Sequence, residues 1–237
     1  MCAQAYNARA VADAASLAGV PLFSGLDPDE LAALAARLRV RRYGRGEVVF
    51  LSGDPGTNLC VVRTGQVKLS ISSPEGREMI FDLLWPPDFF GELALLDGEP
   101  RSADAVATEP TELLLLARDD FLHFLEERPP VAIQLLATLS RRLRRDTKIM
   151  QDTVFLDVPA RLARTILKLA DTHGEKVAEG TLIKARLSQV DLAGLVGTTR
   201  ETLNKWLGVY EEQGLLRWNK GHLTVLQLQG LQRRITW

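Results

Sequence analysis

The stretch FFGELALLDGEPRSADAVA, residues 89–107, combines features that neither a buried strand nor a solvent loop requires. Its leucines are typical of a core, but a Gly91-Glu92 pair precedes them and an Arg101-Ser102 pair follows nine residues after Glu92. A planar guanidinium and a hydroxyl are donors that suit an anion. The stretch therefore predicts a partly apolar pocket for a small anionic ligand.

The individual residues of this stretch support the predicted pocket. Gly91 has no Cβ, so the backbone can approach a ligand closely there. The residues from Leu93 onward can form one helical turn whose free N–H groups face the anion. Arg101 and Ser102 would donate to the same anion. The alternative is an ordinary salt bridge between Arg101 and Glu92 in a loop.

The distribution of charge predicts two modules with different partners. The 237-residue chain has a formal net charge of −1, but residues 1–130 hold 12 Lys and Arg against 20 Asp and Glu. Residues 160–237 hold 12 Lys and Arg against 7 Asp and Glu. An acidic first half and a basic last third favour a second module that faces a polyanion. The length of the chain suits two domains.

Short strand-like runs fill the first module. Segments rich in β-branched and aromatic residues recur about every ten residues, with Gly, Pro and Asp turns between them. They are EVVFL (47–51), LCVVRTG (59–65), QVKLSIS (66–72), EMIFDLLW (78–85) and TELLLLA (111–117). This pattern predicts a β-sandwich or jelly roll. We expect a short amphipathic helix over 26–40, and a short helix or frayed tail over 1–20.

A long helix is predicted from Pro129-Pro130, where a helix can begin. Steps of three and four residues through it define a heptad seam with polar residues at two positions. The seam consists of Ile133, Leu136, Ser140, Leu143, Thr147, Met150 and Val154. The four arginines within 141–145 are predicted to be exposed. The seam favours a helix paired with that of a second copy, and the alternative is a helix packed on its own domain.

The last third of the chain predicts a winged helix-turn-helix. A helix over 159–174 comes first. Ser188 and Asp191 form a capping-box pattern that opens the next helix, and Gly197 ends it. A second helix follows over 198–216, and two short strands around the turn NKG form a wing. The alternative is a plain helical hairpin.

Three motifs, in this order, resemble the cAMP receptor protein (CRP/FNR) family of bacterial transcription regulators. The phosphate-binding cassette of the family resembles the stretch FGELALLDGEPRSA. The helix after the family's hinge resembles FLDVPARLARTILKLA, and its recognition element resembles LVGTTRETLNKWL. The resemblance implies an α+β protein with a jelly-roll cyclic-nucleotide-binding domain, a long dimerisation helix and a winged helix-turn-helix domain. The implied boundaries are 1–20 for an N-terminal extension, 21–130 for the jelly roll, 131–156 for the dimerisation helix and hinge, and 157–237 for the DNA-binding domain.

The same resemblance assigns roles in the pocket. It implies that Glu92 accepts a hydrogen bond from a ribose hydroxyl, and that Arg101 with Ser102 holds a cyclic phosphate. Gly91 and Leu93 belong to the same implied ligand site. The effector that we expect first is cAMP.

The contact to the nucleobase departs from the family pattern. In the best-known member a Thr-Ser pair on the long helix contacts adenine, and the matching residues here are Asp146 and Thr147. Thr147 keeps a hydroxyl. The carboxylate of Asp146 can accept from an exocyclic amine, or it can pair with a neighbouring arginine. Another nucleotide as effector, or no effector, stays open.

Six residues of the helix-turn-helix are predicted to contact DNA: Ser188, Gln189, Thr199, Arg200, Glu201 and Lys205. Arg200 suits the O6 and N7 acceptors of guanine, and Glu201 suits the N4 donor of cytosine. The side chain of Lys205 can reach guanine or a phosphate, and the polar residues at helix starts fit phosphate contacts. Alternatively, Glu201 forms a capping box with Thr198.

No pattern indicates an enzyme or a bound metal. The three histidines show no catalytic or metal-ligand spacing, and Cys2 and Cys60 support neither a disulfide framework nor a four-cysteine cluster. We interpret Cys60 as a core residue of a strand. This cysteine usage predicts a reduced cytoplasmic compartment. No apolar run reaches the ~18 residues of a membrane span, so we expect no membrane partner. The expected partners are promoter DNA, a second copy and RNA polymerase; a regulatory module that acts on a protein partner is the alternative.

Overall fold

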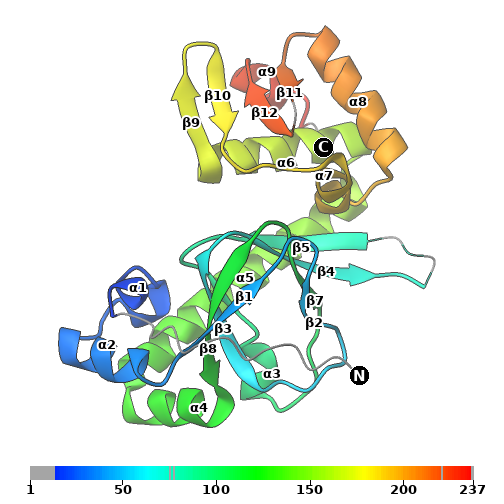
Figure 1. Cartoon of the computed structure of the whole chain (residues 1–237). Coiled ribbons are helices and arrows are strands. Elements are labelled where there is room, and N and C mark those ends of the chain that lie inside the picture. The colour runs from blue at the N-terminus through cyan, green and yellow to red at the C-terminus, as the bar shows by residue number, and fades with distance from the viewer. Residues whose placement is uncertain (1–13, 75, 77, 220, 236–237) are drawn as a thin grey trace. The chain divides into compact units, whose positions relative to one another are not determined.

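The computed structural model describes residues 14–74, 76, 78–219 and 221–235. The chain divides into two compact units, which Figure 1 draws together. The first comprises Met1–Ile71 and Asp82–Arg142, and the second comprises Ser72–Phe81 and Leu143–Trp237. The helix or tail predicted for 1–20 lies outside the described residues up to position 13, and α1 occupies Ala15–Ala18.

Two further short helical segments lead into the first unit. They are a 3-10 turn (Pro21–Phe23) and α2 (Pro28–Ala35). A capping box opens α2, because Asp27 accepts from the N–H of Glu30 at 2.9 Å and Glu30 accepts from the N–H of Asp27 at 3.1 Å. The prediction of a helix as far as residue 40 is wrong at its end. Residues 39–43 form a strand instead, since pairing with another strand satisfies their backbone groups.

The described residues between 39 and 117 form two four-stranded sheets, which confirms the predicted β-rich architecture (Figure 1). The first sheet has the order β1 (Arg39–Tyr43), β8 (Thr111–Ala117), β3 (Asn58–Thr64) and β6 (Phe89–Phe90). The second has the order β2 (Val48–Phe50), β7 (Asp104–Ala107), β4 (Val67–Ser72) and β5 (Glu78–Leu84).

The stretch 89–107 connects these two sheets. Its first residues form β6 in one sheet and its last residues form β7 in the other, with the single turn α3 (Leu93–Leu96) between them. The inner faces of the sheets bury a shared apolar cluster that includes Cys60, Phe90 and Leu113. The core position of Cys60, which is 2 % exposed, is thereby confirmed.

Two helices follow β8, namely α4 (Arg118–Glu127) and the long α5 (Pro129–Phe155). Val131 and Leu135 on the first turns of α5 are buried in the core of the first unit. The apolar seam residues face elsewhere and are exposed, from 63 % at Leu136 to 72 % at Val154. The helix therefore has one face that packs within its own chain and a second apolar face that the chain leaves open.

Besides the end of α5 and the segment Ser72–Phe81, the described residues of the second unit form four helices and a small sheet. The helices are α6 (Val158–His173), α7 (Gln189–Val196), α8 (Arg200–Glu212) and α9 (Leu228–Gln232). The sheet has the order β11 (Leu216–Asn219), β12 (His222–Val225), β10 (Gly180–Ile183) and β9 (Gly174–Val177).

The predicted helix-turn-helix and wing are confirmed as α7, α8, β11 and β12 (Figure 1). Strands β9 and β10 were not predicted from the sequence, and they extend the wing into a four-stranded sheet. The second helix ends at residue 212 rather than 216. Gly214 adopts φ +66°, which breaks the helix, and the next residues enter β11.

Candidate functional site

A glycine at the end of β6 shapes the predicted ligand site. Gly91 has φ +82°, a left-handed conformation that a side chain rarely adopts. A Cβ at this position would lie 2.5 Å from Nη1 of Arg101. The sequence predicted a close approach of the backbone to a ligand at Gly91. The structure shows a close approach of the backbone to Arg101, and any larger residue would displace that guanidinium.

Arg101 is buried at the centre of this site, with 5 % of its surface exposed. Its Nη1 donates to the carbonyl of Gly91 at 2.6 Å, and its Nη2 donates to the carbonyl of Asn58 at 2.7 Å. Its guanidinium carbon lies 4.2 Å from the centre of the Phe50 ring. Burial lowers the pKa of Arg101, and the nearby Cys60 and Glu92 partly oppose that effect. One donor, Nε, is buried without a hydrogen-bond partner among the described residues.

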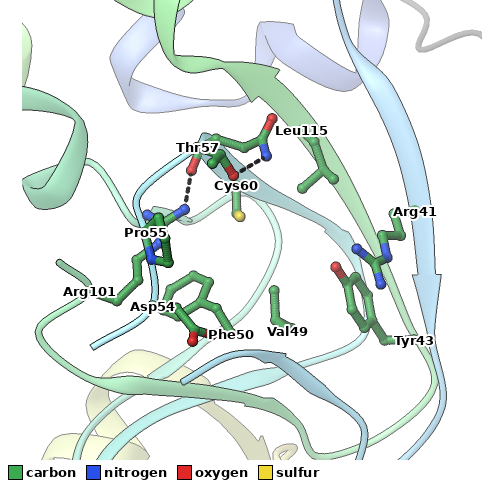
Figure 2. A pocket seen from close by; sticks show the side chains of 11 residues that line it. Arg41, Tyr43, Val49, Phe50, Asp54, Pro55, Thr57, Cys60, Arg101 and Leu115 are labelled. Atoms are coloured by element: carbon green, nitrogen blue, oxygen red, sulfur yellow. Dashed lines mark hydrogen bonds between the residues drawn. The ribbon is translucent and has the colours of Figure 1, made fainter. Parts of the chain in front are cut away.

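A cavity of about 310 Å³ opens beside Arg101 (Figure 2). Figure 2 shows Arg101 above Phe50 at one end and Arg41 with Tyr43 at the other. Burial raises the pKa of Tyr43 and of the Cys60 thiol to about 12, so both groups are neutral at neutral pH. The charged lining residues are two arginines and Asp54, which makes the cavity electropositive.

Glu92 follows Gly91 directly and is 3 % exposed. Its Oε1 accepts from Nη1 of Arg142 at 2.6 Å, and Arg142 also donates to the carbonyl of Phe89. Glu92 therefore pairs with Arg142 on α5, and the salt bridge considered between Glu92 and Arg101 is not formed. The other oxygen, Oε2, is buried and has no partner among the described residues.

We predicted that all four arginines within 141–145 are exposed, and this is wrong for two of them. The side chain of Arg142 is 20 % exposed, and that of Arg145 is 29 % exposed. Arg142 is the main site residue that sequence reasoning missed. A signal for it exists, because Arg142 lies seven residues after Leu135, on the same helix stripe that is buried in the core.

The remaining predicted ligand residues lie outside the buried part of the site. Leu93 is 46 % exposed, and Ser102 is exposed in the loop before β7. Asp146 and Thr147 lie on the part of α5 that belongs to the second unit. Asp146 accepts from Nε of the neighbouring Arg145 at 3.4 Å, and the Thr147 hydroxyl donates to the carbonyl of Leu143 at 2.9 Å.

The first helix of the helix-turn-helix, α7, begins and ends as its residues predicted. The Ser188 hydroxyl accepts from the N–H of Asp191 at 3.0 Å and completes a capping box. Gly197 closes α7 with φ +68°. The N-cap of α8 is Thr199, whose hydroxyl accepts from the N–H of Thr202 at 3.3 Å. The capping box considered between Thr198 and Glu201 is therefore not formed.

The first residues of α8 present polar side chains to solvent. Arg200, Glu201 and Lys205 are all exposed. Nε of Arg200 donates to Oε1 of Gln189 at 3.4 Å, which joins α8 to the start of α7. Hydrogen bonds from its own backbone N–H and from Thr199 lower the pKa of Glu201, so its carboxylate is ionised at neutral pH. All three predicted base-contacting side chains therefore lie on the surface at the start of α8.

Neither a metal site nor a membrane span accompanies these features in the part of the chain that the structure describes. No group of three or more His, Cys, Asp or Glu side chains is arranged to hold a metal ion there. None of the described helices combines the length and the apolar character that crossing a bilayer requires.

An electropositive cavity in a β domain and a winged helix-turn-helix define the class of ligand-responsive DNA-binding regulators. Residues 40–128 match the model of the cyclic nucleotide-binding domain, and residues 160–234 match the Crp-like helix-turn-helix domain. The chain belongs to the CRP/FNR family of transcription regulators, and it is not an enzyme.

Several proteins of this family resemble the chain over most of its length. It is 34 % identical to a CRP-like cAMP-activated global transcriptional regulator of Mycobacterium tuberculosis, over 92 % of this chain and 97 % of that protein. It is 38 % identical to the cyclic AMP receptor protein of Thermus thermophilus, over 87 % of this chain and 93 % of that protein. A solved structure of the c-di-GMP responsive regulator CLP of Xanthomonas campestris is similar with a TM-score of 0.71 and 26 % identity, covering 80 % of this chain and 94 % of that chain.

Proposed function

We propose that the protein is a homodimeric transcription regulator whose binding to promoter DNA is controlled by a cyclic nucleotide, with cAMP as the first candidate. The observation that supports a bound ligand is that two buried polar atoms, Oε2 of Glu92 and Nε of Arg101, have no hydrogen-bond partner among the described residues. A buried polar atom left unsatisfied costs about 1–3 kcal/mol. A ligand with an acceptor and a donor in the right places would remove both costs.

A cyclic nucleotide has the chemistry that these atoms require. Its phosphate would accept from Arg101, which has five N–H donors and uses two of them in the bonds to Gly91 and Asn58. Its ribose hydroxyl would donate to the free Oε2 of Glu92. Arg142 fixes the other oxygen of that carboxylate, so the acceptor is oriented before the ligand arrives. Ser102 and the residues from Leu93 would complete the phosphate contact.

The base is the part of the effector that the site residues define least. Several relatives are named for cAMP, one solved structure is of a c-di-GMP responsive regulator, and other relatives are global nitrogen regulators. In this proposal Asp146 and Thr147 reach the base from α5. A carboxylate at position 146 accepts hydrogen bonds only, so it favours bases with amino or imino donors, which both adenine and guanine have. We therefore keep cGMP as the comparison ligand.

The second copy and the DNA complete the proposal. The open seam of α5 supports a second copy, because a row of exposed apolar residues at heptad spacing needs a partner helix. The two α8 helices of such a dimer would read successive major grooves of a two-fold symmetric site. RNA polymerase as a further partner and a cytoplasmic location belong to the same proposal.

Calorimetry of the full-length protein with cAMP and with cGMP tests the proposal. The titrations are repeated with a duplex selected from a random library by the wild-type protein. We expect cAMP to bind and its affinity to rise about 5- to 150-fold when the duplex is present, the usual range for coupled sites. Tighter binding of cGMP would assign base selection to Asp146. No binding of either nucleotide would contradict the proposed effector.

A further inference from the structure

One arginine in the first turn of α6 joins the ends of two other helices. Nη1 of Arg161 donates to the carbonyl of Leu156 at 2.9 Å. Its Nε donates to the carbonyl of Val196 at 2.9 Å, and its Nη2 donates to the carbonyl of Gly197 at 3.2 Å. Each of the three guanidinium nitrogens therefore has its own acceptor, and all these residues belong to the second compact unit.

The three acceptors lie where helices leave carbonyls unsatisfied. Leu156 comes directly after α5, and its N–H still bonds to the carbonyl of Asp152. Val196 is the last residue of α7, and Gly197 is its C-cap. The final carbonyls of a helix lack partners within the helix and carry the negative end of its dipole. A single cation thus satisfies the ends of α5 and α7 together.

One of these two helix ends directly precedes α8, the helix that is predicted to contact DNA. Gly197 lies three residues before Arg200, the first residue of α8. The position of α8 is also tied to the start of α6, because the Tyr210 hydroxyl donates to the carbonyl of Pro159 at 2.9 Å. A second arginine of α6, Arg164, pairs with Asp152 on α5. The first turns of α6 therefore connect the end of the long helix with the turn that precedes the recognition helix.

We propose that Arg161 is a positioning residue that makes the placement of α8 depend on the C-terminal end of α5. Arg161 touches neither ligand nor DNA in this role. A shift of the Leu156 carbonyl moves the guanidinium, and the guanidinium moves the Val196 and Gly197 carbonyls, because its planar fork is rigid. Transmission of the effector's signal along this path rests on the proposed function, but the mechanical link itself does not.

The substitution Arg161→Lys tests the link, since it keeps the charge while one ammonium cannot replace three donors held in a rigid plane. The control is Arg234→Lys in the same unit, where the arginine has one exposed bond, to Gln213 at 2.7 Å. Full-length proteins are compared for affinity to the selected duplex with and without saturating cAMP, for cAMP affinity without DNA, and for amide hydrogen exchange.

For Arg161→Lys we expect duplex affinity in saturating cAMP to fall about tenfold, with cAMP affinity unchanged. Amide exchange should accelerate at 152–157 and 196–200 and stay unchanged in the middle of α6. The control should match the wild type. Acceleration spread over the whole unit, or duplex affinity and exchange equal to the wild type, would overturn the proposal. If the wild-type protein shows no response to cAMP, the proposed effector is wrong, and the exchange comparison still decides the role of Arg161.

Discussion

At the scale of single residues, Glu92 and Arg101 lie in the same short segment and carry opposite charges, but they do not form an ion pair with each other. Arg101 is held by backbone carbonyls, and Glu92 is held by Arg142. Each charge therefore has a partner that leaves one polar atom free. Had the two charges paired with each other, the loop would be a closed structural contact with nothing to offer a ligand.

Replacement of Arg101 should remove the phosphate contact. We expect Arg101→Leu to abolish cAMP binding in calorimetry, and Arg101→Lys to fold and bind at least about tenfold more weakly, which is about 1.4 kcal/mol. A lysine keeps the charge but cannot keep two carbonyl bonds and also donate to a phosphate. Arg37→Lys, on an exposed arginine that pairs with Asp120 at 3.6 Å, is the control. An unchanged dissociation constant for both Arg101 variants would make Arg101 a purely structural residue.

Replacement of Arg142 should lower the free energy of unfolding, because the buried carboxylate of Glu92 would lose its ion-pair partner. With Arg142→Met the carboxylate, 3 % exposed, loses its only ion-pair partner among the described residues. We expect the free energy of unfolding in urea to fall by about 3 kcal/mol, at the lower end of the range for a broken buried pair. Arg145→Met is matched to it on the same helix. Its partner Asp146 has a side chain that is 49 % exposed, so the expected loss is below about 1 kcal/mol. Equal losses in both variants would contradict the buried role of the Glu92–Arg142 pair.

At the scale of elements, α5 has two faces with different surroundings. One stripe, through Val131, Leu135 and Arg142, packs on its own unit and reaches Glu92. The other stripe, the seam, is exposed throughout. The same helix can therefore contact the ligand site of its own chain and the α5 of a second copy.

A charge on the seam should separate the copies without unfolding them. Leu143 is 68 % exposed in the single chain, so Leu143→Asp removes little packing from the protomer. In a dimer the aspartate would be buried without a partner, and we expect monomers in light scattering. Arg141→Asp, which lies off the seam on an exposed arginine bonded to Thr138, should stay dimeric. A Leu143→Asp protein that remains a dimer would place the interface on another face.

At the scale of the whole molecule, an acidic first half is joined to a basic winged helix-turn-helix, and the proposed function requires two copies of that helix-turn-helix on one DNA site. The exposed start of α8 carries Arg200, held by Gln189 of α7 at 3.4 Å. This bond uses Nε of Arg200. In the proposed function the two terminal nitrogens of the guanidinium would donate to the O6 and N7 acceptors of guanine.

Loss of Arg200 should change which sequences are bound as well as how tightly. We expect Arg200→Ala to weaken binding to the selected duplex by about 1–3 kcal/mol and to relax the preference at one G·C position in each half-site. Arg234→Ala, on the same unit, should alter neither. Binding to a library of single-base variants measures both effects. A uniform loss across the library would make Arg200 a phosphate contact.

Local patterns were sufficient wherever a residue acts through its own backbone or its nearest neighbours in the chain. The capping box of Ser188 and Asp191, the end of α7 at Gly197 and the start of α5 were all predicted, because caps and turns are decided within about four residues. The alternation of short apolar runs likewise predicted the β domain, and the motifs predicted the family. These features depend on spacing along the chain, which the sequence states directly.

Only the tertiary structure decided which groups pair with the buried charges, and which segments become strands by pairing with a strand that is distant in the sequence. Residues 39–43 become a strand because β8 lies beside them, and β9 and β10 form because β12 completes their sheet. Arg142 meets Glu92 across 50 positions of the chain, and Arg161 meets Gly197 across 36. Such pairings depend on which surfaces packing brings together, and a charge in the sequence does not state which opposite charge or carbonyl will be within its reach.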